Sequence, residues 1–143
     1  ACEMRYSTLE ARFSIKEIAI GMAADVVTLQ RMPLLLGDGM LRELAFTGRT
    51  FGGEEACSMG LVNRTYSDHA ALLAGVMALA REIAAKSPVA VRGTKEMLRY
   101  MRDHRIDDGL EYVATWNASM LQSEDLRIAI AAHMSKQKPE FSN

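Results

Sequence analysis

The pattern of apolar and polar positions divides the chain into an irregular beginning and a helical remainder. Residues 1–16 alternate short apolar and polar pieces without helical spacing, which favours short strands, one of them at 13–15. From Asp68 onward, apolar residues recur every three or four positions, as in amphipathic helices. Helices are predicted at 23–32, 38–46, 54–59, 69–83, 88–102, 107–121 and 124–133, with a short strand at 61–66.

Capping residues support several of these helix ends. Ser87-Pro88 places a hydroxyl at the cap and proline in the first turn, and Ser123 is expected to cap the last helix. Asp38 is the expected cap of the helix before Gly48, and Asp107 is expected to open the helix at 107–121. The four helices after Asp68 should bury one apolar face each. The expected inward residues include Leu73, Leu98, Leu110 and Ile130.

Two carboxylates stand in the apolar stretch 13–32, FSIKEIAIGMAADVVTLQRM. Glu17 would follow a short strand, and Asp25, eight residues later, would lie in the first turn of the helix at 23–32. A carboxyl group in apolar surroundings is more easily kept protonated, and two such groups suit acid–base chemistry. The pattern is equally that of a solvated loop glutamate followed by a helix-capping aspartate, so it does not establish a site alone.

Composition limits the function classes. The chain has 143 residues, of which 49% are hydrophobic and 24% charged, as in an ordinary globular domain. The net charge is −1 and no basic block is present, so we expect no nucleic-acid partner. Charges interrupt every apolar run, so no membrane span is predicted. The two cysteines and three histidines are not at metal-ligand spacing, so no metal site is expected.

The order of these elements resembles the crotonase (enoyl-CoA hydratase/isomerase) superfamily. The stretches ACEMRY, ELAFTGRTFGGEEACSMGLVNRTY, SPVAVRGTKEML and SEDLRIAIAAHMSKQKPEF carry the resemblance, together with the carboxylate stretch. Within the superfamily, KEIAIGMAADVVTLQR looks like the Δ3,5-Δ2,4-dienoyl-CoA isomerases, whereas ordinary hydratases have a glycine at the position of Asp25. The implied fold class is α/β, the C-terminal half of a ClpP/crotonase-like spiral ββα fold, mostly helical in this chain.

The resemblance implies roles for particular residues. Glu17 matches the glutamate beside the substrate's α-carbon, and Asp25 matches the aspartate that marks the dienoyl isomerases. Lys138 and Phe141, in KQKPEF, match residues that lie against the coenzyme A of a neighbouring subunit in related hydratases. A solvated tail with one packed phenylalanine is an equally good interpretation of KQKPEF. Coenzyme A would be part of the acyl-CoA substrate, and no other cofactor is expected.

The implied reaction converts 3,5-dienoyl-CoA to 2,4-dienoyl-CoA in fatty-acid β-oxidation. One proton leaves C2 and one arrives at C6, through a dienolate whose oxygen needs hydrogen-bond donors. Two separate carboxyl groups suit these distant transfers, and we assign Glu17 to C2 and Asp25 to C6. The rival interpretations are an enoyl-CoA hydratase, a lyase of the same superfamily, and a non-catalytic oligomerisation module.

The family pattern also extends before Ala1. Residues 1–66 match the C-terminal part of the core with the active-site acids, and residues 67–143 match a helical oligomerisation region. In relatives the oxyanion-hole donors and most of the coenzyme A pocket precede this point. We therefore expect the isolated chain to have little activity, and to need a larger protein or a complementary N-terminal half. The expected assembly is a homotrimer or hexamer in mitochondria or peroxisomes, although no targeting signal is visible in the chain.

Overall fold

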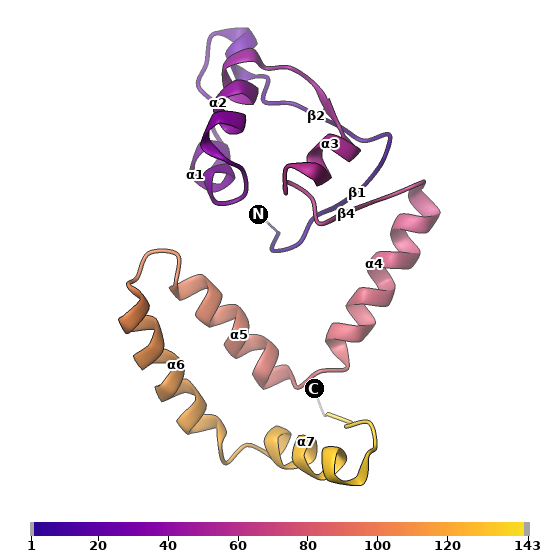
Figure 1. Ribbon diagram of the computed structural model, residues 1–143, viewed down its shortest axis with the longest axis vertical. Coiled ribbons are helices and arrows are strands. Elements are labelled where there is room, and N and C mark those ends of the chain that lie inside the picture. The colour runs from indigo at the N-terminus through magenta and orange to yellow at the C-terminus, as the bar shows by residue number, and fades with distance from the viewer. Residues whose placement is uncertain (1, 142–143) are drawn as a thin grey trace. The chain divides into compact units, whose positions relative to one another are not determined.

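The computed structural model describes residues 2–141, drawn in Figure 1. The chain forms two compact units, one ending at Met77 and the next beginning at Ala78. The boundary falls inside helix α4 (His69–Ala84), so a single helix leads from the first unit into the second. The sequence predicts a different division, into a core part with the active-site acids at residues 1–66 and an oligomerisation region at residues 67–143. That division concerns function, and it stays a prediction.

The first unit contains two small sheets. Strand β1 (Tyr6–Thr8) pairs in parallel with β4 (Arg64–Tyr66), and β2 (Arg12–Phe13) pairs antiparallel with β3 (Phe51–Gly52). Where β2 meets β3, the rings of a phenylalanine pair stack with their centroids 5.6 Å apart. Strands that lie far apart in the sequence therefore hold the beginning of the chain against its middle.

Short helices connect and cover these strands. They are η1 (Glu17–Ile20), α1 (Thr28–Arg31), η2 (Met32–Leu34), α2 (Asp38–Thr47) and α3 (Gly53–Ser58). Gly48 ends α2 in the left-handed conformation (φ 61°), as its position in the sequence predicted. The predicted cap of α2 is wrong by one residue, because Gly37 occupies the cap and Asp38 lies in the first turn, paired with Arg42.

The helix predicted at 23–32 is wrong over its first half, since α1 begins only at Thr28. Val26 and Val27 have φ values of 47° and 68°, which no right-handed helix accommodates. Asp25 consequently lies before the helix, not in its first turn. Its backbone carbonyl accepts a hydrogen bond from the Thr28 N–H at 3.0 Å.

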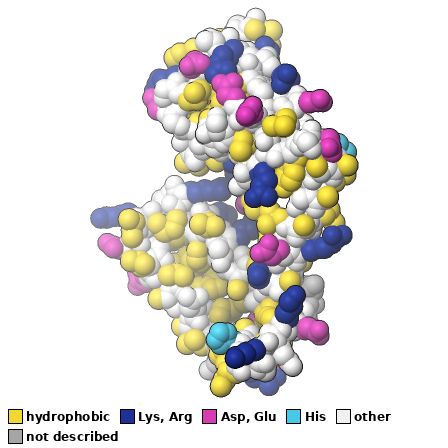
Figure 2. All heavy atoms as spheres, turned by 45° about the vertical axis from the view of Figure 1, so that its right-hand side comes forward, with side chains coloured by type: hydrophobic (Ala, Val, Ile, Leu, Met, Phe, Trp, Pro, Cys, Tyr) yellow, Lys and Arg dark blue, Asp and Glu magenta, His cyan; other side chains and the backbone are white. Residues whose placement is uncertain are grey.

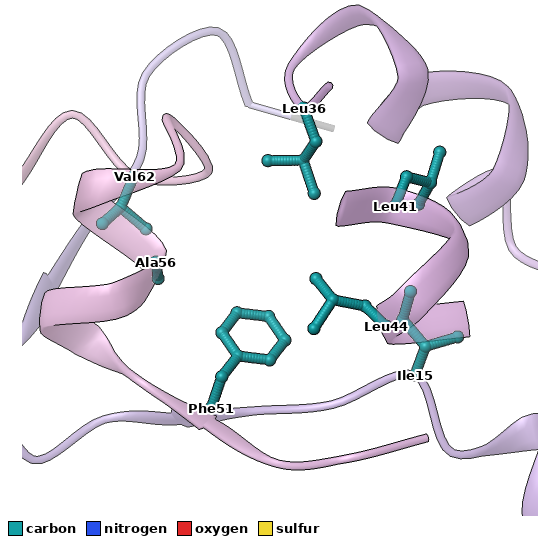
Figure 3. Packing of buried hydrophobic residues seen from close by; sticks show 7 residues of the cluster. All are labelled: Ile15, Leu36, Leu41, Leu44, Phe51, Ala56 and Val62. Atoms are coloured by element: carbon teal, nitrogen blue, oxygen red, sulfur yellow. The ribbon is translucent and has the colours of Figure 1, made fainter. Parts of the chain in front are cut away.

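The hydrophobic core of the first unit joins the strands to α2 and α3. Leu44 is fully buried, and Figure 3 shows it beside Ile15 and facing Phe51. Ile15 is 5% exposed and lies two residues before Glu17, so the core fixes the entry to η1. The buried cluster consists of Ile15, Leu36, Leu41, Leu44, Phe51, Ala56 and Val62.

An arginine links the two main helices of this unit at their surface. Arg49 donates to Glu43 at 2.8 Å and to Glu55 at 2.6 Å, connecting α2 with α3. The hydrogen bond from Arg49 holds the pKa of the Glu55 carboxyl below its usual value. One guanidinium thus serves two acidic partners from different helices.

Helices α5 (Pro88–Tyr100), α6 (Ile106–Met120) and α7 (Glu124–Ser135) form the rest of the second unit. The predicted caps of α5 and α7 are confirmed, because Ser87 Oγ accepts the Ala90 N–H and Ser123 Oγ accepts the Leu126 N–H. Helix α6 begins one residue earlier than predicted, at Ile106. Its cap residue Arg105 donates its backbone N–H to the carboxylate of Asp108.

A glycine allows α5 and α6 to pack closely. A Cβ atom at Gly93 would clash with the ring nitrogen of Trp116, so the indole fills the space that a side chain would need. Trp116 meets Tyr112 edge-on, and Tyr112 in turn contacts Tyr100 at a centroid distance of 4.6 Å. Aromatic rings therefore form the contact between α5 and α6.

The predicted inward faces of the C-terminal helices are only partly buried. Leu98 and Leu110 are 67% and 61% exposed, and Leu73 and Ile130 are each 52% exposed. Hydrophobic side chains are accordingly widespread on the visible surface in Figure 2. The expectation that these four residues point into a core is wrong for this chain, because a periodic pattern predicts an apolar face but not what covers it. Among the helices of residues 2–141, none has the length and apolar character needed to cross a membrane.

Candidate active site

Glu17 stands at the start of η1 in a well-defined turn. Its side chain is half-buried, and its backbone carbonyl accepts the Met22 N–H at 3.0 Å. Gly21 closes the turn with φ 76°, a conformation that favours glycine, and donates its N–H to the Ile18 carbonyl at 3.2 Å. The core anchor at Ile15 and the closed turn together fix the backbone that carries the Glu17 carboxylate.

Asp25 lies eight residues farther along, in the loop between η1 and α1. Its side chain is exposed, and it is followed directly by the two left-handed valines. Left-handed backbone at a β-branched residue is costly, and such strain is found at functional sites where the surrounding structure holds it. Asp25 therefore lies in the loop that follows the helix carrying Glu17, directly before two residues with positive φ.

The apolar neighbours of the two carboxylates are on the surface of this chain. Ile20 is 74% exposed and Val26 is 85% exposed, and Met22 and Val27 are about half exposed, at 52% and 54%. The sequence suggested that apolar side chains enclose the two carboxylates, but the described residues do not enclose them. They present both carboxylates on an open segment that is rich in exposed aliphatic groups.

Lys138 and Phe141 belong to the second unit and follow α7. Lys136 ends this helix in the left-handed conformation (φ 56°), and the Gln137 N–H bonds to the Ala132 carbonyl at 2.9 Å. Beyond this cap Lys138 is exposed and Phe141 is half-buried. The lysine ammonium is thus accessible to a charged ligand, while the phenylalanine packs partly against the protein.

The second unit also has an apolar groove of about 630 Å³ between α5, α6 and α7. Trp116, Met97 and Leu126 are among the apolar residues that line it, and Ser87 and Asp125 supply polar groups. Sequence reasoning did not predict this groove, because it depends on how three helices pack. Within residues 2–141, no group of three or more His, Cys, Asp or Glu side chains is placed to hold a metal ion.

Sequence reasoning also missed a contact next to the candidate glutamate. Lys16 Nζ donates a hydrogen bond of 3.0 Å to the backbone carbonyl of Gly48, across 32 residues of sequence. The sequence contained only an indirect signal, a lysine beside an acidic candidate and a glycine at a helix end. No local pattern indicates that these two residues meet.

The sequence pattern of the enoyl-CoA hydratase/isomerase family matches residues 1–143, the whole chain. The chain belongs to this family, as its motifs predicted. It is 48% identical over 137 residues to the mitochondrial Δ(3,5)-Δ(2,4)-dienoyl-CoA isomerase of Mus musculus. These aligned residues make up 95% of this chain and 42% of the mouse protein. It is 46% identical over 142 residues to the peroxisomal Δ(3,5)-Δ(2,4)-dienoyl-CoA isomerase of Arabidopsis thaliana, covering 99% of the chain and 51% of that protein.

Solved structures of the family confirm the fold. The enoyl-CoA hydratase of Bacillus anthracis superposes with a TM-score of 0.93 at 26% identity, over 98% of this chain and 54% of that one. The chain therefore has the crotonase fold predicted from its sequence, in a mostly helical part. It spans between about two fifths and half of the length of these isomerase relatives.

Proposed function

We propose that this chain supplies the two proton-transfer residues of an isomerase that converts 3,5-dienoyl-CoA to 2,4-dienoyl-CoA. The observation that carries the proposal is the placement of Glu17 and Asp25 on one short apolar segment anchored in the core at Ile15. The identities of 46–48% to dienoyl-CoA isomerases from a mammal and a plant support the reaction type.

In the proposed reaction the ionised Glu17 carboxylate removes a proton from C2, where the thioester makes it acidic. The electron pair moves into a dienolate, and protonated Asp25 then delivers its proton to C6. Glu17 ends protonated and Asp25 ends ionised. Before the next turnover Glu17 must release its proton to water, and Asp25 must take up a proton from water. Two separate groups are needed because C2 and C6 lie too far apart for one carboxylate.

The dienolate oxygen needs hydrogen-bond donors that we place outside this chain. We assign them to a complementary N-terminal half, corresponding to the part of the relatives that this chain does not match. Removing one such donor typically costs about 100- to 1000-fold in rate. The 143 residues alone should therefore have little activity, and the same half would cover the exposed aliphatic groups around Asp25.

Coenzyme A and further subunits complete the proposal. The exposed ammonium of Lys138 and the half-buried ring of Phe141 are proposed to contact the coenzyme A of an acyl-CoA substrate bound to a neighbouring subunit. The exposed faces at Leu98 and Leu110 support association, which we propose to be a homotrimer or hexamer. We place the protein in mitochondria or peroxisomes, the compartments named for the mouse and Arabidopsis relatives.

Two other functions are weaker. The chain is only 29% identical to a probable enoyl-CoA hydratase of Bacillus subtilis, well below its identity to the isomerases. A non-catalytic oligomerisation module would be favoured by the exposed helix faces alone. Light-scattering mass measurements of the chain with and without an acyl-CoA test this third function, which predicts a stable oligomer that does not respond to the ligand.

The direct test uses a chimaera in which this chain replaces the matching 137 residues of the mouse isomerase. We expect Asp25→Asn to slow formation of the conjugated 2,4-diene, followed by ultraviolet absorbance, by about 100-fold or more. Asp107→Asn, which changes an exposed carboxylate in α6, is the matched control and should keep the parent rate. Full isomerisation by Asp25→Asn with loss of 2-enoyl-CoA hydration would instead support the hydratase.

A further inference from the structure

The segment that carries Glu17 is held against the C-terminal end of α2. Lys16 Nζ donates to the Gly48 carbonyl at 3.0 Å, and Gly48 itself donates its N–H to the Leu44 carbonyl at 3.0 Å. Carbonyls at the end of a helix lack partners within the helix, and a cation there also interacts favourably with the helix dipole. The Lys16 ammonium therefore has both a geometric and an electrostatic reason to stay at this carbonyl.

Gly48 touches the same segment on both sides of the Lys16-Glu17 pair. A Cβ atom at Gly48 would lie 2.9 Å from Ile18 Cγ2 and 3.2 Å from the Ile15 carbonyl oxygen. Gly48 is buried, and Ile15 packs beside Leu44 of α2 in the core (Figure 3). Glu17 is thus flanked by residues that are pressed against one end of α2, and Lys16 adds the hydrogen bond that joins the two segments.

We propose that Lys16 is a positioning residue that fixes the Glu17 carboxylate relative to α2. The inference rests on the proposed role of Glu17 as the base at C2. Without the ammonium, η1 keeps its contacts through Ile18 and Ile15 but loses the hydrogen bond to Gly48, and so gains freedom to shift. A shift of about 1 Å in a reacting group can cost about 100-fold in rate, so a contact outside the reacting atoms matters for turnover.

Steady-state kinetics of the chimaera test this role. Lys16→Met should lower kcat about 10- to 100-fold while KM for the dienoyl-CoA changes less than about threefold. Lys16→Arg should restore most of kcat, because a guanidinium can donate to the same carbonyl. The control Lys86→Met removes a lysine charge from the second unit and should leave kcat unchanged.

A double substitution separates positioning of Glu17 from a general loss of structure. If Lys16 acts through Glu17, adding Lys16→Met to Glu17→Gln should lower the residual kcat no further. A further tenfold fall in the double variant would overturn the inference. So would a Lys16→Met enzyme with the parent kcat, provided that Glu17→Gln is inactive. Parent activity in Glu17→Gln would instead overturn the proposed function itself.

Hydrogen exchange of the 143-residue chain gives a readout that does not depend on activity. The Ala19, Gly21 and Met22 amides close η1, and Lys16→Met should make them exchange about fivefold faster or more. The Met59 and Gly60 amides at the end of α3 provide the internal reference and should exchange at the parent rate. Equal acceleration at both places would mean that Lys16 serves overall stability, and would overturn the positioning role.

Discussion

The Ser87 hydroxyl donates a hydrogen bond of 2.5 Å to the Asp125 carboxylate and so joins the N-terminal ends of α5 and α7. The same carboxylate oxygen accepts the Val89 N–H at 3.4 Å, and Asp125 also lies in the first turn of α7. A negative charge near two helix N-termini is favourable, and it satisfies backbone N–H groups that lack partners within the helix. One side chain therefore stabilises the beginning of two helices.

Replacing Asp125 by alanine should destabilise the second unit by about 1–2 kcal/mol, because it removes a charged acceptor shared by two helix ends. Trp116 is the only tryptophan of the chain and lies in this unit, so its fluorescence during urea unfolding measures the effect. Asp107→Ala, in the first turn of α6 and exposed, should cost about 0.5 kcal/mol or less. Equal losses for the two variants would contradict this account of Asp125.

Stability of the turn between α5 and α6 should depend on pH through His104. Its ring Nδ1–H lies 2.8 Å from the Tyr100 carbonyl and 2.7 Å from an Asp103 oxygen, and the ring stacks on that of Tyr100. The hydrogen bond to the Tyr100 carbonyl, followed by the Asp103 carboxylate and the charge of Asp108, raises the His104 pKa above its ordinary value of 6.5. The charged imidazolium is thus favoured in the folded chain.

Because the folded pKa is the higher one, the stabilisation is complete below about pH 6.5 and is lost as pH rises through the folded value. Wild type should exceed His104→Gln in unfolding midpoint at pH 5.5, and this difference should shrink toward pH 8.5. NMR titration of His104 should give a higher pKa in the folded chain than in urea. A difference that grows with pH, or a lower folded pKa, contradicts the assignment.

The left-handed backbone at Val26 predicts an unusual response to glycine. Val26 is 85% exposed, so its side chain contributes little burial, whereas its φ of 47° is costly for a β-branched residue. Val26→Gly should therefore leave the free energy of unfolding unchanged or raise it by up to about 1 kcal/mol. Val91→Gly, inside α5, should lower it by about 1 kcal/mol or more. Urea unfolding followed by circular dichroism measures the free energy of unfolding of both variants. Equal losses of free energy in the two variants would show that Val26 is not strained.

Local signals in the sequence predicted what is set locally. A hydroxyl followed by proline at Ser87, and glycine after an apolar run at Gly48, specify helix ends through bonds to nearby backbone, and both are found. The helix at 23–32 failed because composition and spacing do not reveal that two adjacent valines adopt positive φ. Such a conformation is imposed by the surrounding fold and opposes the residues' own preference.

Contacts between segments that are distant in the sequence could not be predicted from it either. Periodicity identified the apolar faces that include Leu98 and Leu110 but could not tell that they are exposed in this chain. The Lys16–Gly48 hydrogen bond joins residues 32 positions apart, and the local sequence around either residue does not indicate that they meet. The carboxylates Glu17 and Asp25 were found from their spacing and from family motifs, and their catalytic roles stay predictions.

Solvent exchange in the chimaera tests the division of labour between these carboxylates most directly. In D₂O, Asp25→Asn should still exchange the C2 hydrogens of 3,5-dienoyl-CoA, as detected by mass spectrometry. Its rate of 2,4-diene formation should fall by about 100-fold or more. Glu17→Gln should lose both exchange and product. Rapid diene formation by Asp25→Asn, or parent-rate C2 exchange by Glu17→Gln, would contradict the assignment of Glu17 to C2 and Asp25 to C6.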